Sequence, residues 1–505
     1  MAPWRNRDSF PSFMAAKGPV SGIQDLHVET VNRVHVGRGG SPWEVASRAK
    51  STLCRLRGHP WSQILLISLI CFCCPGMYNA LTGLGGCGQV DATVAANATV
   101  ALLSTMAVTS LFIAGPLFAW AGPRISLMAG GWTYALYSGS FLNFNRTGNG
   151  ALVIASGAML GVGASLLWIV QGAIMTSYVD ESRKGRAIAI FWVVFNLGGG
   201  IGSLASFGLN YGSGKGTVSS STYVALMIVM LFGWSLGLLL YSPERVRGTK
   251  TTAPAPKAAR PWHRIIIDVA RNSARVLCTW RVACMLPLFF SANVFYSYQQ
   301  NSVNGDTFNI HTRSLNGAFY WLAQMGGGLF IGLILDLPCL GRRGRARLGW
   351  SIAFVFGLII WGGGYQFQLW QNDRLARGQR QDVDFKDSAL AAGPMTLYTF
   401  YGAYDALWQA FAYWLIGTES NDPTRAAILV GAYKGLQAAG GSIAWRINAF
   451  SVSSMTELAM NWGLCIGSLL VVLPVVWTVS ASSDDEGDQP ERGFDEGSKG
   501  DGTQV

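Results

Sequence analysis

The chain has 505 residues, of which 50% are hydrophobic, 12% aromatic and only 13% charged, and an average soluble protein carries about twice that fraction of charged residues. With a mean hydropathy of +0.29, this composition excludes an ordinary soluble protein and predicts an all-α protein that crosses the membrane many times. The net charge of +11 fits basic loops facing anionic lipid, so it requires no nucleic-acid partner. We find no nucleotide-binding loop, nucleophile elbow or zinc-binding helix in the sequence. We therefore expect no enzyme activity, cofactor or metal.

The chain begins with a polar, basic segment at 1–58, for which we predict a disordered cytoplasmic tail. The first apolar stretch, 61–82, is long enough to cross a bilayer. Pro75-Gly76 interrupts this stretch, and a glycine-rich run, residues 83–88, follows it. These breaks indicate a place where backbones or a solute come close to Asn79.

Eleven more apolar stretches complete two sets of six on either side of a basic connector, a layout typical of the major facilitator architecture. The sequence predicts a six-helix bundle at 59–241, a cytoplasmic linker at 242–280, a second six-helix bundle at 281–479 and a disordered acidic cytoplasmic tail at 480–505. In the linker, Arg264–Leu277 has an apolar face that predicts a helix on the membrane surface. The expected spans are 61–82, 98–118, 125–143, 151–176, 187–209, 222–241, 281–300, 313–335, 348–366, 394–417, 427–446 and 456–479.

The basic residues orient the protein. If both termini are cytoplasmic, all but nine of the 38 lysines and arginines lie on the cytoplasmic side, as the positive-inside rule requires. The nine exceptions are Lys434 within a span and Arg146, Lys215, Arg313, Arg374, Arg377, Arg380, Lys386 and Arg446 on the other side. The glycosylation sequons at Asn97 and Asn145 also fall on the other side. Asn97 is close to the second span, so Asn145 is the better acceptor.

The two halves repeat a short cytoplasmic motif. Gly115, Gly122 and Arg124 follow the second span, and Gly332, Asp336, Arg342 and Arg343 follow the eighth. Both stretches resemble the glycine, aspartate and arginine loop of major facilitator proteins, which implies a gating role. The first copy has Ala119 where the motif has aspartate. The basic residues after Asp336 also fit simple contact with lipid headgroups. The alternative is that they form a gating contact with Asp336.

Four stretches carry a family resemblance: LICFCCPGMYNALTGLGGCGQVD in span one, GVGASLLWIVQGAIMTSY in span four, KGRAIAIFWVVFNLGGGIGS in span five and AYKGLQAAGGSIAWRI in span eleven. They resemble the fungal branch of the uncoordinated-protein-93-like (ion channel regulatory protein-like) family of the major facilitator superfamily. The resemblance implies a twelve-helix protein whose solute is generally unassigned. It also implies relatives in animals that regulate channels or assist the trafficking of other membrane proteins.

Two charged residues inside spans are the first functional candidates. A carboxylate well inside a span, as predicted for Asp405, is costly unless it is protonated, paired or facing water. Lys434, in the next span, is its possible partner. The functional interpretation is a pair that couples transport to protons or binds solute. The alternatives are a structural ion pair and a cavity-facing residue with no direct role.

Uncharged polar residues and tryptophans give weaker candidates for solute binding. Gln171, Gln299 and Gln300 can bond a neutral or zwitterionic solute, although hydrogen bonds between helices explain them equally well. Asn79 and Asn196 lie beside glycines and fit close helix packing better than binding. Trp168 and Trp408 occupy matching positions of the repeat, where they wall a cavity or simply pack.

The sequence therefore favours a secondary transporter of a small organic solute, working by alternating access and with a possible proton coupling. The alternative is a non-transporting scaffold, regulator or trafficking chaperone that binds another membrane protein. The expected location is a lipid bilayer of the plasma membrane or of a vacuolar or other internal membrane.

Overall fold

The computed structural model describes residues 58–89, 92–178, 184–212, 218–242, 245–246, 271, 275–337, 339–419 and 423–480. All the helices described below belong to one compact unit, Arg57–Val505. The two predicted tails and the predicted surface helix, Arg264–Leu277, lie almost entirely outside the described residues.

The first half of the fold begins with a span built from three helical pieces. They are α3 (Pro60–Cys71), the π-helix η1 (Phe72–Gly76) and α4 (Met77–Gly83), followed by the short η2 (Gly86–Gly88). Pro75 lies inside η1 and has no N–H to give to the helix, which accounts for the irregular turn. The other helices of this half are α5 (Thr93–Phe112), α6 (Ala114–Gly130), α7 (Thr133–Thr147), α8 (Ala151–Ser177), α9 (Lys184–Asn210), α10 (Ser220–Leu236) and η4 (Gly237–Leu239).

The second half also begins with a broken span, formed by α12 (Trp280–Ser291), α13 (Phe295–Ser297) and the π-helix η6 (Tyr298–Gly305). Long helices then follow one another along the chain. They are α14 (Ile310–Leu335), α15 (Arg342–Ala376), α16 (Ser388–Glu419), α17 (Pro423–Ala449) and α18 (Ser454–Trp477).

These helices make up twelve spans in two sets of six, and the prediction of an all-α membrane protein is confirmed. Eight of the described helical stretches are long and apolar enough to cross a membrane by themselves. The boundary between spans two and three falls at Gly122, inside the expected connection between 98–118 and 125–143. The chain turns at Gly122, whose φ of 73° interrupts α6, so the first part of α6 continues span two and the rest begins span three. Glycine adopts this backbone conformation with little strain.

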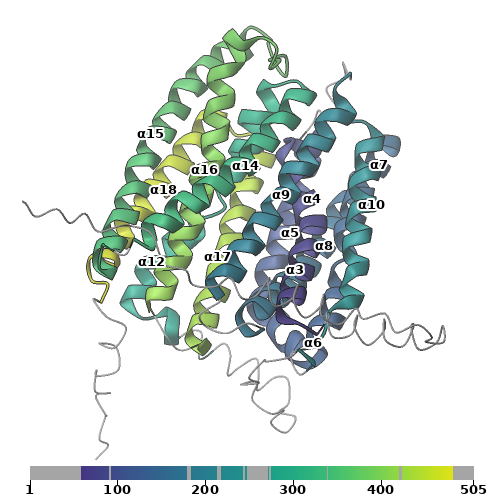
Figure 1. Ribbon diagram of the computed structural model, residues 1–505. Helices are drawn as coiled ribbons and strands as arrows, with labels where there is room; N and C mark the ends of the chain where they lie inside the picture. The colour runs from purple at the N-terminus through teal and green to yellow at the C-terminus, as the bar shows by residue number, and fades with distance from the viewer. Residues whose placement is uncertain are drawn as a thin grey trace, which may run out of the picture. The chain divides into compact units, whose positions relative to one another are not determined.

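The two halves meet along two pairs of helices. Figure 1 shows the purple and blue helices of the first half beside the green and yellow helices of the second. Helix α5 packs against α17, and α9 packs against α14. Since each pair joins one helix from either half, the two bundles share a long interface within this unit.

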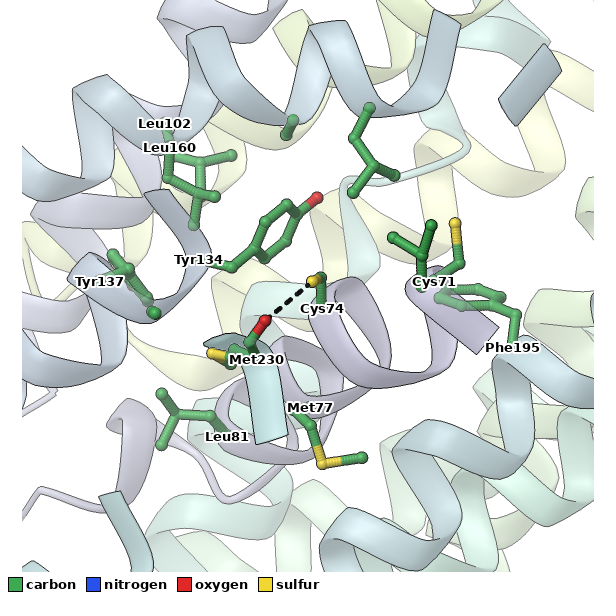
Figure 2. Close-up of a cluster of buried hydrophobic side chains, with 14 of the residues drawn as sticks. Cys71, Cys74, Met77, Leu81, Leu102, Tyr134, Tyr137, Leu160, Phe195 and Met230 are labelled. Atoms are coloured by element: carbon green, nitrogen blue, oxygen red, sulfur yellow. Dashed lines mark hydrogen bonds between the residues drawn. The ribbon is translucent and has the colours of Figure 1, made fainter. Parts of the chain in front are cut away.

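Cysteine and methionine side chains pack with leucine and aromatic side chains in the core of the first half around span one (Figure 2). Cys71 and Cys74 are buried, and the Cys74 thiol donates a hydrogen bond of 3.4 Å to the Met230 carbonyl of α10. The eight cysteines of the described residues are all free, including Cys87. No disulfide therefore forms among the described residues, and the buried cysteines act as small apolar fillers.

The π-helical turn of span one lies directly against the backbone of α9. A Cβ atom added at Gly76 would be 2.9 Å from the Gly198 Cα, and one added at Gly198 would be 2.4 Å from the Phe72 carbonyl oxygen. Only glycine at both positions lets the two helices come this close. The glycine run after Asn196 therefore serves helix packing.

We expect Gly198→Ala to destabilise the protein by about 1–3 kcal/mol, because the added methyl group would push two backbones apart. Gly208→Ala is the matched control on the same helix, since nothing lies within 4 Å of its added Cβ. Alanine there should be neutral or stabilise the helix by up to about 1 kcal/mol. Thermal unfolding of the two purified variants measures the difference. Equal melting temperatures would contradict this account of the packing.

Candidate functional site

One end of the bundle is closed by hydrogen bonds between the two halves. Arg313, near the start of α14, is buried, with only 1% of its surface exposed. Its guanidinium donates to the carbonyl oxygens of Leu84 and Gly85, each at 2.6 Å. A buried guanidinium needs acceptors such as these, and the broken end of span one supplies them, with the Gly85 carbonyl also accepting from the Gly88 N–H at 2.9 Å.

Two asparagines extend this contact. The Asn304 side chain donates to the Gly83 carbonyl at 2.8 Å, and the Asn301 side chain accepts from the Gly86 N–H at 2.7 Å. We call this set of residues the latch: Gly83, Leu84, Gly85 and Gly86 of the first half with Asn301, Asn304 and Arg313 of the second.

A buried carboxylate is joined to the latch through asparagines. Asn301 donates to the Asn448 side-chain oxygen at 2.6 Å, and Asn448 donates to both carboxylate oxygens of Glu457, at 2.9 and 3.1 Å. Sequence reasoning missed Glu457, although a carboxylate in the first turn of an apolar span was a visible signal.

The loop between α15 and α16 covers the same end of the bundle. Arg380 pairs with Asp306 at 2.6 Å, and the Lys386 ammonium lies 5.0 Å from the ring of Tyr211 in the first half. Burial alone would raise the pKa of Asp384, but hydrogen bonds from the Lys386 N–H and from His311 outweigh it and hold the pKa below its usual value. The loop thus adds charged contacts outside the latch.

A cavity of about 190 Å³ lies between the two halves. Its lining includes Asn79, Trp168 and Phe195 from the first half and Gln300 and Trp321 from the second. Asp405 and Lys434 both face it. The cavity is therefore mostly aromatic and apolar with two opposite charges, which is the composition of a small-molecule site.

Protein donors surround the Asp405 carboxylate. The side chain is 1% exposed. One oxygen, Oδ2, accepts from Tyr296 and from Gln324, and the Tyr320 hydroxyl lies 3.5 Å from it while donating to Gln299 at the shorter distance of 2.9 Å. The other, Oδ1, accepts from Gln409 at 3.2 Å. Three donors from the protein therefore stabilise the carboxylate with no cation in contact with it.

Lys434 has different surroundings. Its ammonium donates to Gln437 at 2.9 Å and lies 5.3, 5.5 and 5.8 Å from the ring centres of Tyr433, Tyr413 and Trp168. These distances are those of cation–π contacts. Both Lys434 and Asp405 are described, and they form no direct ion pair.

Two glutamines connect the charges instead. Gln437 donates to the Gln409 side-chain oxygen at 3.1 Å, and Gln409 donates to Asp405. From Lys434 through Gln437 and Gln409 to Asp405, each residue donates to the next. Sequence reasoning missed both glutamines. Gln437 follows Lys434 by three residues and Gln409 follows Asp405 by four, so each glutamine lies on the same helix face as its charge. This spacing was the signal available in the sequence.

The other predicted binding residues divide into two groups. Asn79, Trp168 and Gln300 line the cavity, and the Gln300 side-chain oxygen is buried without a hydrogen-bond partner. Four others lie away from the cavity lining: Gln171, Gln299, Asn196 and Trp408. All of them except Gln171 are buried, and Gln299 accepts a hydrogen bond from Tyr320 at 2.9 Å.

The predicted gating residues lie at the end of the bundle opposite the latch. Arg342 donates to the Thr418 carbonyl at 3.1 Å, and Arg343 donates to the Val479 carbonyl at 2.8 Å. These carbonyls belong to the ends of α16 and α18, where a positive charge is favourable. Asp336 is exposed and forms no ion pair with either arginine. The first-half motif residues Gly115, Gly122 and Arg124 lie on α6, and Arg124 is exposed.

The two sequons occupy helices at the latch end. Asn97 lies within α5, and its side-chain oxygen accepts from Arg446 at 2.7 Å. Asn145 lies near the end of α7 and is exposed, although its side-chain oxygen accepts from Gln89 at 2.8 Å. Asn145 is thus the more accessible of the two.

Comparison with solved structures supports the architecture. The chain is similar to a D-xylose–proton symporter, with a TM-score of 0.55 and 13% identity over 83% of this chain and 97% of that one. It is also similar to the xylose transporter XylE from E. coli, with a TM-score of 0.57 and 12% identity over 82% and 97%. At these identities the likeness shows the fold alone, that of major facilitator transporters.

Comparison with known sequences identifies the family. Residues 92–337 match the family described as "Ion channel regulatory protein UNC-93". UNC93-like protein 1 of Arabidopsis thaliana is 42% identical over 435 residues, 85% of this chain and 93% of the relative. A UNC93-like protein of Schizosaccharomyces pombe is 39% identical over 421 residues, 83% of this chain and 82% of the relative. The chain, a multi-pass membrane protein with the major facilitator fold, therefore belongs to the UNC-93 family.

Proposed function

We propose that this protein is a secondary transporter that moves a small organic solute across the membrane by alternating access. The observation that carries this proposal is the cavity, which both halves line and in which Asp405 and Lys434 face the same space. In this mechanism the two halves rock about a central site and expose it to each side in turn.

The latch supports this mechanism because it joins the halves at one end of the cavity through hydrogen bonds between side chains of the second half and backbone groups at the end of span one. Such contacts break and reform without unfolding a helix. The distribution of lysine and arginine supports an orientation with both termini in the cytoplasm and the latch on the non-cytoplasmic side. The structure then corresponds to a state closed to the outside.

The proposal also includes coupling of transport to protons through Asp405. Asp405 is buried in the second half and is connected to Lys434 through Gln409 and Gln437. Protonation of Asp405 would turn an oxygen that accepts hydrogen bonds into a donor. This change would rearrange the hydrogen bonds that position Gln409 and, through it, the side of the cavity that holds Lys434.

A non-transporting regulator of another membrane protein is the second candidate. The description of the matching family, an ion channel regulatory protein, favours it. The first-half motif, in which Ala119 replaces aspartate, also favours it, because a lost gating charge matters less to a protein that does not cycle.

The test is uptake by the full-length protein in proteoliposomes, measured for a broad panel of small organic solutes with and without an inward proton gradient. Saturable uptake of a solute that the gradient accelerates supports proton-coupled transport. Saturable uptake that ignores the gradient supports transport and overturns the coupling. Folded protein that takes up no solute in the panel would favour the regulator.

A further inference from the structure

The two charges in the cavity are not equally available to a solute. The donors closest to Asp405 already point at its carboxylate: Tyr296 and Gln324 at one oxygen and Gln409 at the other. A cationic solute would have to displace some of these donors and leave them buried without partners, which costs free energy.

Lys434, by contrast, has few hydrogen-bond partners among the described residues. An ammonium group has three N–H donors. One points to Gln437, and in the described part of the chain no second hydrogen-bond acceptor reaches the other two. The ring faces of Trp168, Tyr413 and Tyr433 stabilise the charge but accept no conventional hydrogen bond. Two N–H groups therefore remain for a ligand.

The rest of the cavity is built to hold a ligand with an apolar body. Aromatic rings and aliphatic side chains cover most of its wall, including Trp168, Trp192, Phe195, Trp321, Leu102 and Met106. Two buried polar atoms in the lining also have no partner, the Gln300 side-chain oxygen and the Trp321 indole N–H. These two atoms face a space that a solute can fill, where polar groups of the solute can serve as their partners.

We propose that the solute is a small organic anion whose negatively charged group binds the Lys434 ammonium and whose apolar, ring-sized body packs against the aromatic wall. The inference rests on the proposed transport function of this cavity. It follows from hydrogen bonding in a medium of low dielectric constant, where a buried charged group needs hydrogen-bond partners for its donors or acceptors. Asp405 has its partners from the protein, and Lys434 receives its partner from the solute.

Three probes of nearly equal shape and different charge test the proposal: benzoate, benzamide and benzylamine. Binding to the purified full-length protein is measured by calorimetry at neutral pH. We expect saturable binding of benzoate at least tenfold tighter than that of benzamide, and no measurable binding of benzylamine. Charge-assisted hydrogen bonds to Lys434 are the reason for the difference.

Variants assign the effect to Lys434. Lys434→Gln should weaken benzoate binding at least tenfold and leave benzamide binding nearly unchanged, while Lys434→Arg should keep the preference for the anion. Arg347→Gln is the matched control, because Arg347 is another cation over an aromatic ring, 5.4 Å from that of Trp477, and lies outside the cavity lining. It should bind benzoate like the unmodified protein.

The proposal is overturned if benzoate fails to bind, if benzamide or benzylamine binds as tightly, or if Lys434→Gln keeps the affinity for benzoate. None of these results removes the proposed function, because uptake of a neutral or cationic solute from the panel would still establish transport. Failure of the proposed function is the separate result in which folded protein takes up no solute at all.

Discussion

Replacing Gly85 with alanine is expected to prevent the latch from closing. Gly85 has a φ of 71°, where an alanine is strained by about 1–2 kcal/mol. The larger effect is steric, because the added Cβ would be 2.3 Å from the Gln300 carbonyl oxygen and 2.7 Å from the Gly305 Cα. Both neighbours are backbone atoms of η6, so no side chain can rotate to make room. The two halves must separate at this end.

A cysteine-reactive probe measures the result. In a background without reactive cysteines, a cysteine in place of Asn304 reports the accessibility of the latch, and we expect Gly85→Ala to increase its labelling rate at least tenfold. Gly148→Ala is the control, since Gly148 has a φ of 69° and nothing within 4 Å of an added Cβ. This control should lose about 1 kcal/mol of stability and leave the labelling rate unchanged. Equal labelling of the two variants would contradict the latch.

Replacing Asp405 with asparagine is expected to reduce gradient-driven uptake at least 100-fold. An asparagine side chain has almost the same shape, but it presents an NH₂ group where the protein offers only donors. Whichever way the amide turns, its NH₂ faces either Gln409 or the group formed by Tyr296, Tyr320 and Gln324. The variant also cannot release a proton, so any coupling through this residue is lost.

The control for Asp405→Asn is Asp373→Asn, an exposed carboxylate near the end of α15 and outside the cavity lining. It should transport like the unmodified protein. Initial uptake rates in proteoliposomes with and without the proton gradient are compared for all three proteins, after their melting temperatures show that each is folded. Gradient-driven uptake by Asp405→Asn at the unmodified rate would exclude Asp405 from the coupling.

Much of the fold could be predicted because the membrane restricts it. A stretch that crosses the hydrocarbon layer must satisfy its own backbone, so about twenty uncharged residues predict a helix almost regardless of detail. Helix ends were less predictable. The helix α15 runs from Arg342 to Ala376, well beyond the expected 348–366, since helical hydrogen bonds continue into water where hydropathy gives no signal.

The candidate site shows the complementary limit. Asp405 and Lys434 stood out because a charge inside an apolar stretch is rare. Gln409 and Gln437 join the two charges because α16 and α17 are packed against each other in a particular way. The spacing of residues along the chain does not determine that packing. Arg313 was counted as a loop charge by its position near a span end. Its burial depends on carbonyl acceptors from the other half, and the Leu84 carbonyl is 229 residues away in sequence.

The central claim, that the two halves move against each other during transport, can be tested by locking them together. Ser104 of α5 and Ser442 of α17 lie on opposite halves with their hydroxyl oxygens 2.7 Å apart. A variant carrying both Ser104→Cys and Ser442→Cys can therefore form a disulfide across the interface. We predict that oxidation lowers its solute uptake at least tenfold, that a reductant restores it, and that neither single variant responds. Full uptake by completely cross-linked protein would contradict alternating access through this cavity.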